Sequence, residues 1–352
     1  MKVLYAIQGT GNGHISRALD LVPRFKKRVD CDVMISGIQA DIVAPFEMNH
    51  RCQGMSFIFG KTGGINYVST LQRTSIFSLL HEINHFPIEQ YDAVINDFEP
   101  VTSWAAKLKN IPCISLSHQS AVLGPNAPKP KSGGFLAKQV LKRYAPCDYA
   151  LGFHFDTYDE QTFSPIIRNR VRQQPITNNG HYTVYLPAYS DERIIRQLRH
   201  FGDLKWEVFS KHTRTHYQVD NVFIQPIENE AFVNSMASSE GVLCGAGFET
   251  PAEALYMGKK LMVIPMKSQY EQHCNAAGLK VLGIPVINGF GDAELHPIAD
   301  WLMEKSRLQI NYPDNAQRVV DRVIGFTREL LGNHQAVQHE MGDLNEMKAT
   351  GS

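Results

Sequence analysis

Short apolar runs alternate with helical patterns along the first half of the chain. The runs at Lys2–Ile7 and Cys31–Gly37 predict strands, and the segment between them, from about Ser16 to Arg28, predicts a helix. The scheme repeats with strands at Tyr91–Asp97 and Ile111–Gln119 that a further helix joins. Because these runs are apolar almost throughout, they suit parallel strands that are buried on both faces. Strands that alternate with helices predict a doubly wound α/β sheet.

The same rhythm restarts after a polar segment. Residues Arg168–His181 contain a proline and an Asn-Asn-Gly turn signal, so we interpret them as a linker. Further strands are predicted beyond it at Tyr182–Ala188, Lys205–Ser210, Asn221–Ile227, Gly241–Gly247 and Lys260–Met266. The amphipathic segment Val319–Leu331 predicts a final helix. At about 150 residues per domain, we expect two α/β domains over residues 1–170 and 171–330, followed by a tail over residues 331–352.

Charge and cysteine usage exclude several classes of protein. The formal net charge is zero, which argues against a general nucleic-acid binder. The six cysteines are scattered and form no Cys-x-x-Cys pair, so we expect no zinc site. No apolar run approaches the ~20 residues that span a bilayer, and no secretory leader precedes the first strand. We therefore expect a cytoplasmic protein with reduced thiols.

Three glycines alternate with other residues directly after the first predicted strand. Gly9, Gly11 and Gly13 lie at the carboxyl end of that strand, where parallel α/β sheets bind ligands. Glycine lets the backbone approach a ligand, and the following helix offers its N-terminal amides to an anion; a plain tight turn is the alternative. A dinucleotide fingerprint does not fit, because His14 replaces its third glycine and the second strand ends without a carboxylate. A Walker loop does not fit, because no Lys-Ser/Thr pair follows.

His14 closes this stretch and is its most informative residue. The positive end of a helix dipole disfavours an imidazolium, so an imidazole at a helix N-terminus stays neutral and can accept a proton. We interpret His14 as a candidate general base. A histidine that caps the helix is the alternative.

A second constellation of chemistry-bearing residues lies between Gly245 and Ala276. A Gly-x-Gly turn after a strand leads into a helix with Pro251 in its first turn, where the missing N–H costs nothing. Gly247, Phe248 and Thr250 therefore offer donors to a diphosphate, and Glu253 could accept hydrogen bonds from a ribose diol. The next strand is followed by a carboxylate and an amide that suit sugar hydroxyls, Glu271 and Gln272.

These motifs, in this order, resemble those of GT-B glycosyltransferases of the UDP-glycosyltransferase and family 28 type, which include the N-acetylglucosaminyltransferase that forms lipid II. The opening Gly-Thr-Gly-Asn-Gly-His is similar to the family's glycine-rich loop. Gly245–Leu255 is similar to its Ser-Gly-x-x-Thr-x-x-Glu motif, and Tyr270–Ala276 resembles the end of its sugar-contact motif. Ile114–Ser120 is similar to the segment that ends an acceptor-facing strand. The resemblance implies two Rossmann-like domains that face each other across a cleft, with the acceptor on the first and the nucleotide sugar on the second.

The resemblance also implies roles for individual residues. His14 would be the base that activates the acceptor, and Asp97 would orient it, with Glu99 as a second candidate. Ile227 would read the uracil edge with its backbone, and Glu253 would bind the ribose. The remaining nucleotide-sugar contacts would come from Gly11, Gly13, Gly245, Gly247, Phe248, Thr250, Glu271 and Gln272. The acceptor side would include Arg17, Glu99, His118 and Gln119.

The chain departs from the family pattern at three positions. Gly245 stands where the plant enzymes have a histidine near the diphosphate, and Glu249 stands where they have an asparagine. A carboxylate beside a diphosphate would repel it unless the carboxylate points away or holds a partner. Glu271 replaces an aspartate, and its longer arm could alter the sugar preference.

The reaction that these residues imply is an inverting transfer of a hexosyl group. His14 would remove a proton from an acceptor hydroxyl, and UDP would leave from the opposite face, stabilised by helix N-terminal amides. The sequence has no Asp-x-Asp pair suited to hold Mg²⁺ at a diphosphate, so we expect neither a metal nor another cofactor. A UDP-N-acetylglucosamine 2-epimerase and a non-catalytic nucleotide-sugar-binding protein are the alternatives.

We expect the acceptor to be a sugar, a lipid-linked compound or another small molecule. The predicted helix in Gly133–Pro146 carries apolar residues beside Lys138, Lys142 and Arg143. Such a helix could dock on an anionic membrane at its cytoplasmic face and receive a lipid-linked acceptor. The alternative is core packing with a solvated basic edge.

Overall fold

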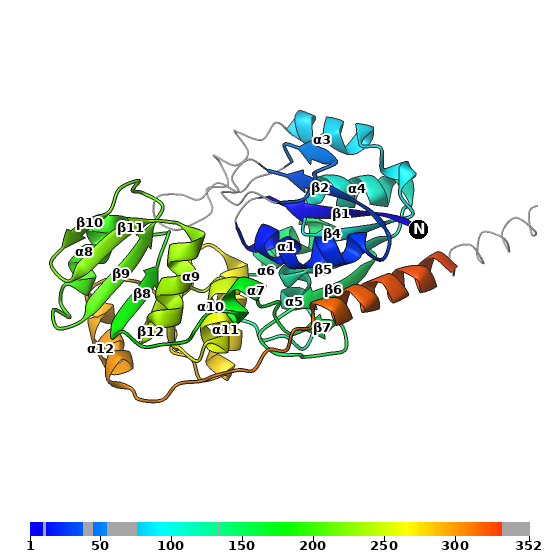
Figure 1. Cartoon of the computed structure of the whole chain (residues 1–352). Coiled ribbons are helices and arrows are strands. Elements are labelled where there is room, and N and C mark those ends of the chain that lie inside the picture. Colours follow the sequence, from blue (N-terminus) through cyan, green and yellow to red (C-terminus); the bar gives the residue numbers. More distant parts are fainter. Residues whose placement is uncertain (10–11, 38–44, 55–75, 132–133, 333–352) are drawn as a thin grey trace, which may run out of the picture.

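The chain forms two sheets of mainly parallel strands, each with helices on its faces (Figure 1). The structure is a computed structural model and describes residues 1–9, 12–37, 45–54, 76–131 and 134–332. The first half of the chain builds one sheet and the second half builds the other. This arrangement confirms the two Rossmann-like α/β units that the alternation of strands and helices predicts.

The first sheet is parallel, in the order β3-β2-β1-β4-β5-β6-β7. Its strands are β1 Lys2–Gln8, β2 Asp30–Ser36, β3 His50–Cys52, β4 Ala93–Asp97, β5 Cys113–Ser117, β6 Tyr149–Phe153 and β7 Thr162–Phe163. Its helices are α1 Asn12–Lys26, α3 Ile76–His85, the short η1 Ile88–Gln90, α4 Pro100–Lys109, α5 His118–Leu123 and α6 Phe135–Tyr144. The strand order reverses between β1 and β4, and ligands of open α/β sheets bind at the carboxyl ends of such a pair.

The second sheet has the order β10-β11-β9-β8-β12-β13, in which β10 is antiparallel to β11. Its strands are β8 His181–Tyr185, β9 Lys205–Ser210, β10 Tyr217–Val219, β11 Val222–Pro226, β12 Gly241–Gly245 and β13 Lys260–Ile264. Its helices are α8 Asp191–Leu198, α9 Asn229–Ser238, α10 Glu249–Tyr256, α11 Tyr270–Val281, η2 Asp292–Glu294 and α12 Leu295–Met303, and α7 Asn169–Arg172 lies within the predicted linker. Here the order reverses between β8 and β12, so the Gly245–Gly247 turn lies at the second reversal.

Apolar packing joins the two units. One continuous core cluster contains residues from both sheets, including Phe153 of β6 and Val242 of β12. The ring of Phe155, which follows β6, lies 5.2 Å from the ring of Phe248 at the start of α10. The carboxyl ends of the two sheets are therefore held against each other by buried aromatic contacts.

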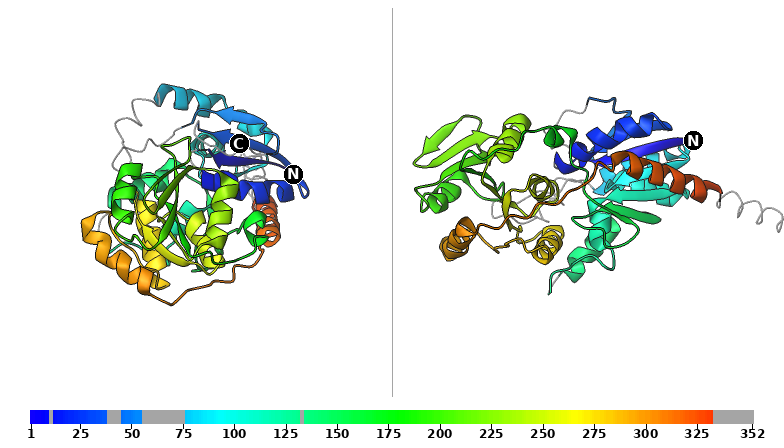
Figure 2. Two further views of the ribbon diagram at one scale, coloured as in Figure 1. Left: turned by 60° about the vertical axis from the view of Figure 1, so that its left-hand side comes forward. Right: turned by 60° about the horizontal axis from the view of Figure 1, so that its bottom comes forward.

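The last described helix, over residues 316–332, returns to the first unit (Figures 1 and 2). Its Val319 and Val323 are fully buried, and the Phe326 ring lies 5.1 Å from that of Tyr149 at the start of β6. Asp321 also pairs with Arg28 at 3.0 Å. The amphipathic pattern predicts this helix, and the structure packs it against the first sheet although it follows the second in sequence.

Candidate active site

His14 lies in the first turn of α1, just after β1. The chain turns at Gly9, whose N–H donates a 2.6 Å hydrogen bond to the carbonyl oxygen of Ser36 at the end of β2. A Cβ atom on residue 9 would lie 2.6 Å from the same oxygen, so this approach requires glycine. Of the two other glycines in the stretch, Gly11 lies outside the described residues, and Gly13 packs near the side chain of Glu249.

Asp97 is the structural partner of His14. Nδ1 of His14 lies 2.8 Å from Oδ1 of Asp97, which is the last residue of β4 and is fully buried. Burial raises the pKa of Asp97, but Arg17 and His14 outweigh that effect and hold it below its usual range. An ionised carboxylate only accepts hydrogen bonds, so the tautomer that satisfies Asp97 has its proton on Nδ1 and a lone pair on Nε2. Nη2 of Arg17 also lies 3.2 Å from the same Nδ1. No described residue hydrogen-bonds to Nε2 of His14, which is available to accept a proton.

Glu99, the second candidate partner of His14, is engaged elsewhere. Its carboxylate caps α4 by accepting hydrogen bonds from the N–H groups of Val101 and Thr102, at 2.8 and 2.7 Å, and from the Thr102 hydroxyl at 2.6 Å. The turn between Asp97 and Glu99 passes through Phe98 with a φ of 59°, a left-handed conformation that is unfavourable for a bulky residue. The buried Asn96 side chain spans this turn by bonding to both backbone groups of Glu99. The turn therefore separates the two carboxylates, one toward α1 and the other into α4.

Arg17 binds the other side of Asp97. Its Nη2 donates to Oδ1 and Oδ2 of Asp97 at 2.7 and 2.9 Å, and its side chain is 3% exposed. Burial lowers the pKa of Arg17, but the carboxylates of Asp97 and Glu249 raise it more, so the guanidinium remains charged. The sequence assigned Arg17 to the acceptor side; in the structure its hydrogen bonds hold the carboxylate that contacts His14.

Glu249 reaches across from the second unit to the same arginine. Nη1 of Arg17 donates to Oε1 of Glu249 at 2.6 Å. Burial raises the pKa of Glu249 to about 7, against the lowering effect of Arg17 and His14. The carboxylate that stands where the plant enzymes have an asparagine therefore holds a partner, which is one of the two conditions under which it would not repel a diphosphate.

The glycine turn before α10 is open on the side of the predicted diphosphate. A Cβ atom on Gly247 would meet no heavy atom within 4 Å, and Phe248 forms the N-terminal boundary of the helix. Thr250 and Pro251 are the second and third residues of α10. A helix leaves the N–H groups of its first turn without intrahelical partners, so those of Glu249 and Thr250 could receive an anion.

Glu253 is bound by an arginine that the sequence analysis did not single out. Arg168 donates from Nε and Nη2 to the two oxygens of Glu253 at 2.5 and 2.7 Å, and its Nη1 donates to Asn229 at 2.7 Å. The pair is buried, with 13% of Arg168 and 3% of Glu253 exposed. Each carboxylate oxygen retains a second lone pair, so Glu253 can still accept a ribose hydroxyl. A cation beside a predicted diphosphate site was the chemical signal that could have directed attention to Arg168.

His118 and Gln119 link the first unit to α11. The His118 ring stacks on Phe248 with centroids 3.9 Å apart, and its Nε2 lies 2.6 Å from Oδ1 of Asn275. Burial lowers the pKa of His118. Gln119 donates to Glu271 at 3.0 Å. The predicted acceptor-side pair therefore contacts the predicted sugar-contact segment, and Asn275, which the sequence analysis did not identify, joins the two.

The other predicted contacts lie around the same strand ends. Oε1 of Gln272 accepts a hydrogen bond from the Met266 N–H at 3.0 Å, and a Cβ atom on Gly245 would lie 3.9 Å from that oxygen. Ile227 lies between β11 and α9 and is partly exposed.

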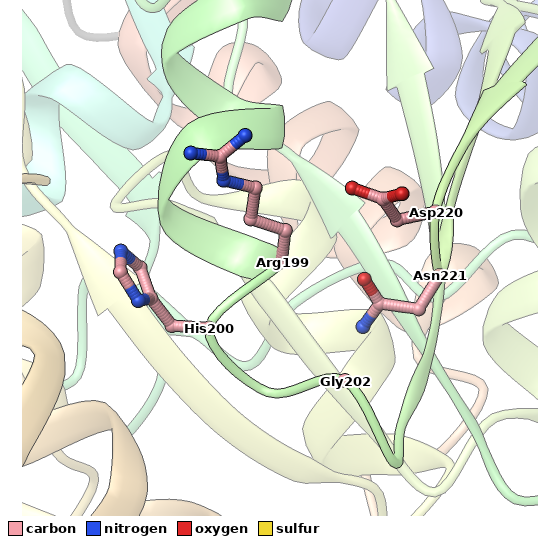
Figure 3. Close-up of a pocket in the computed structure, with 5 residues that line it drawn as sticks. All are labelled: Arg199, His200, Gly202, Asp220 and Asn221. Atoms are coloured by element: carbon pink, nitrogen blue, oxygen red, sulfur yellow. The ribbon is translucent and has the colours of Figure 1, made fainter.

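A surface hollow of about 550 Å³ lies at the amino ends of strands of the second sheet (Figure 3). It is lined by Arg199, His200, Gly202, Asp220 and Asn221. These residues precede β9 and β11, at the amino ends of the strands, so this hollow is separate from the site at the carboxyl ends. In the described part of the chain, no group of three or more metal-ligating side chains gathers, and no helix is long and apolar enough to cross a membrane.

Both the sequence and the fold are similar to those of known proteins. The sequence matches the model of glycosyl transferase family 1 over residues 1–304, and no curated protein matches it. The structure is similar to MurG of Acinetobacter baumannii, at 15% identity and a TM-score of 0.55 over 92% of this chain and 100% of that chain. It is also similar to Phytolacca americana UGT2 complexed with UDP-2-fluoro-glucose and pterostilbene, at 14% identity and a TM-score of 0.56 over 94% of each chain. A UDP-N-acetylglucosamine 2-epimerase is similar at 13% identity and a TM-score of 0.56, over 94% of this chain and 97% of that chain. The chain has the GT-B fold and belongs to glycosyl transferase family 1.

Proposed function

We propose that this glycosyltransferase moves a hexosyl group from a UDP-sugar to an acceptor hydroxyl with inversion. The observation that carries the proposal is the His14–Asp97 pair, which lies at the reversal of the first sheet and is joined through Arg17 to the first residue of α10. The proposed base, His14, and the helix terminus that would bind the diphosphate are thus linked by a continuous chain of hydrogen bonds. The UDP-2-fluoro-glucose complex of UGT2, which shares the fold, supports UDP as the nucleotide.

In this proposal, His14 acts as the general base. Its Nε2 takes the proton of the acceptor hydroxyl while that oxygen attacks the anomeric carbon, and the bond to the UDP oxygen breaks on the opposite face. The imidazolium that forms keeps its hydrogen bond to the Asp97 carboxylate. Negative charge that develops on UDP is received by the first turn of α10.

We further propose that transfer requires no metal ion or other cofactor. The support is the N-terminus of α10, which follows the carboxyl end of β12 and whose first-turn N–H groups can balance the charge of a diphosphate. Activity that survives EDTA treatment and dialysis supports this; activity that EDTA abolishes and Mg²⁺ restores would contradict it.

The first test is the His14→Ala variant. We expect transfer to fall by ~10²–10⁴-fold, the usual contribution of a general base, while UDP affinity measured by calorimetry stays unchanged. Product analysis uses a panel of UDP-sugars with and without acceptors. Loss of UDP binding along with transfer would remove the catalytic assignment, and an epimer or free sugar formed without an acceptor would favour the epimerase alternative.

The acceptor proposal is a lipid-linked compound at the cytoplasmic face of a membrane. On α6, Phe135 is 73% exposed and Val140 is 43% exposed, beside exposed Lys138, Lys142 and Arg143. Gly134 lies so close to the Tyr270 ring that a Cβ atom would clash with it, so α6 begins next to the predicted sugar-contact helix α11. Apolar and cationic side chains together favour an anionic bilayer.

Co-sedimentation with vesicles tests the membrane contact. We expect binding to vesicles that contain phosphatidylglycerol and little binding to pure phosphatidylcholine, with a loss of binding in Phe135→Ser. Equal recovery with both lipids, or no recovery with either, would favour the solvated-edge alternative for α6.

A further inference from the structure

A chain of polar contacts connects the predicted base to the second unit, and this inference rests on the proposed function. His14 contacts Asp97, Asp97 accepts from Arg17, and Arg17 donates to Glu249. The first three residues come from the first unit, and Glu249 opens α10 in the second. A Cβ atom on Gly13 would lie 3.5 Å from Oε1 of Glu249, so the same two segments run close together there. The site of proton transfer is therefore completed only by a side chain from the nucleotide-binding unit.

Charge counting shows what Glu249 changes. Asp97 alone against Arg17 would form a neutral pair, and His14 would then contact a carboxylate whose charge the guanidinium cancels. With Glu249 ionised, the guanidinium is shared between two carboxylates and the cluster carries one net negative charge. A net negative charge next to an imidazole stabilises its protonated form. Because His14 becomes an imidazolium during transfer, Glu249 favours the reaction without touching the substrate.

The other groups around Glu249 do not replace this effect. On its own helix, Glu253 is neutralised by the paired Arg168. On β1, the Tyr5 side chain is fully buried, and burial raises its pKa, so it stays neutral. The ring of Phe153 on β6 lies 5.1 Å from the Arg17 guanidinium and adds no charge. Among the described neighbours, Glu249 is therefore the second carboxylate, besides Asp97, that offsets the charge of Arg17.

We propose that Glu249 is a positioning residue of the active site, which acts through Arg17 to keep Asp97 available to His14 and so links the nucleotide-binding unit to the strength of the base. This role is distinct from binding the diphosphate.

The test is the nearly isosteric Glu249→Gln variant, which keeps an acceptor for Arg17 and removes the charge. We expect kcat to fall about tenfold at pH 8, where the wild-type carboxylate is ionised, and the acid limb of kcat/KM to move to lower pH by about 0.5–1 unit. The KM for the donor should change little. A purely structural role would leave the pH profile in place, and a diphosphate-repelling role would make the variant bind the donor more tightly; either result overturns the proposal.

A second measurement does not depend on transfer activity. The His14 imidazole resonances, followed by NMR in the ligand-free protein, should titrate at lower pH in Glu249→Gln than in the wild type. The matched control is Glu240→Gln, which removes a carboxylate of similar exposure that pairs with Arg307 elsewhere in the same unit. If the proposed transfer fails but the His14 titration moves only in Glu249→Gln, the coupling stands and the assigned reaction is wrong. If the titration is the same in all three proteins, the coupling is wrong whatever reaction is found.

Discussion

Arg168 binds both oxygens of the Glu253 carboxylate, at 2.5 and 2.7 Å, although the two residues lie 85 positions apart in the sequence. Arg168 precedes α7 at the passage between the sheets, and Glu253 lies in α10. Burial lowers the pKa of Arg168, but Glu253 raises it more, which keeps the guanidinium charged. The predicted ribose-binding carboxylate is thus fixed in orientation before any nucleotide arrives.

Replacing Arg168 by Gln should destabilise the protein and weaken nucleotide binding. The variant leaves the Glu253 carboxylate buried without its cation, and breaking a buried pair in this way costs about 3–5 kcal/mol of unfolding free energy. Urea denaturation measures the stability, and calorimetry with UDP measures the affinity.

The control is the double variant Arg168→Gln with Glu253→Gln, which removes both charges. It should recover part of the stability but not the UDP affinity. Full stability in the single variant would contradict the idea that this pair organises the site.

Asp97→Asn should slow transfer without weakening UDP binding. An amide at this position can present its NH₂ group to His14, which favours a proton on Nε2 and removes the free lone pair from the side that faces the acceptor. We expect kcat to fall by ~10²–10⁴-fold, the usual scale for loss of a general base. Steady-state kinetics and UDP calorimetry together check it.

Glu99→Gln is the matched control, because Glu99 is also a buried carboxylate in the same turn but caps α4. It should lower the stability through the weakened cap, by about 0.5–2 kcal/mol, and leave the transfer rate of the folded protein close to wild type. Equal rate losses in both variants would point to the turn as a whole and not to the Asp97–His14 contact.

The pH dependence of stability should reveal the burial of Glu249. Its pKa is raised from 4.5 to about 7, so the folded protein holds this proton more tightly than the unfolded chain. The contribution of this proton to the unfolding free energy is therefore fully present below pH 4.5 and is lost as the pH rises through 7. We expect the wild type to lose about 1–3 kcal/mol over this range relative to Glu249→Gln. Denaturant titrations of both proteins from pH 5 to 8 measure the difference. A wild-type curve that runs parallel to that of the variant would contradict the raised pKa.

The sequence could locate the site because the positions of its residues follow from topology. His14 and Asp97 each come at the end of a predicted parallel strand, and the carboxyl ends of parallel strands share one edge of a sheet. Gly247 and Thr250 could be placed in the same way on the second sheet. Fold class and the two clusters were therefore predictable from apolar runs and from where the polar residues interrupt them.

Partner choice was not predictable, because it depends on how the two units are oriented. Arg17 and Glu249 are separated by 232 positions, and nothing local shows that their side chains meet. Glu99 and Asp97 are equivalent as carboxylates in the sequence, yet Pro100 at the start of α4 makes Glu99 the cap. The last helix has a clear amphipathic pattern, but the pattern does not say which sheet receives its apolar face.

Gly9→Ala should destabilise the first unit because the strand-to-helix turn has no room for a methyl group. The added Cβ would lie 2.6 Å from the Ser36 carbonyl oxygen, a backbone atom that cannot move aside without distorting the end of β2. We expect a loss of about 1–3 kcal/mol of unfolding free energy, the usual cost of overpacking. Gly325→Ala is the control, since a Cβ at that helical position meets no heavy atom within 4 Å and alanine is the better helix former. Thermal and urea unfolding should therefore move in opposite directions for the two variants. If Gly9→Ala unfolds like the wild type, the tight turn that brings His14 to Asp97 does not require glycine at residue 9.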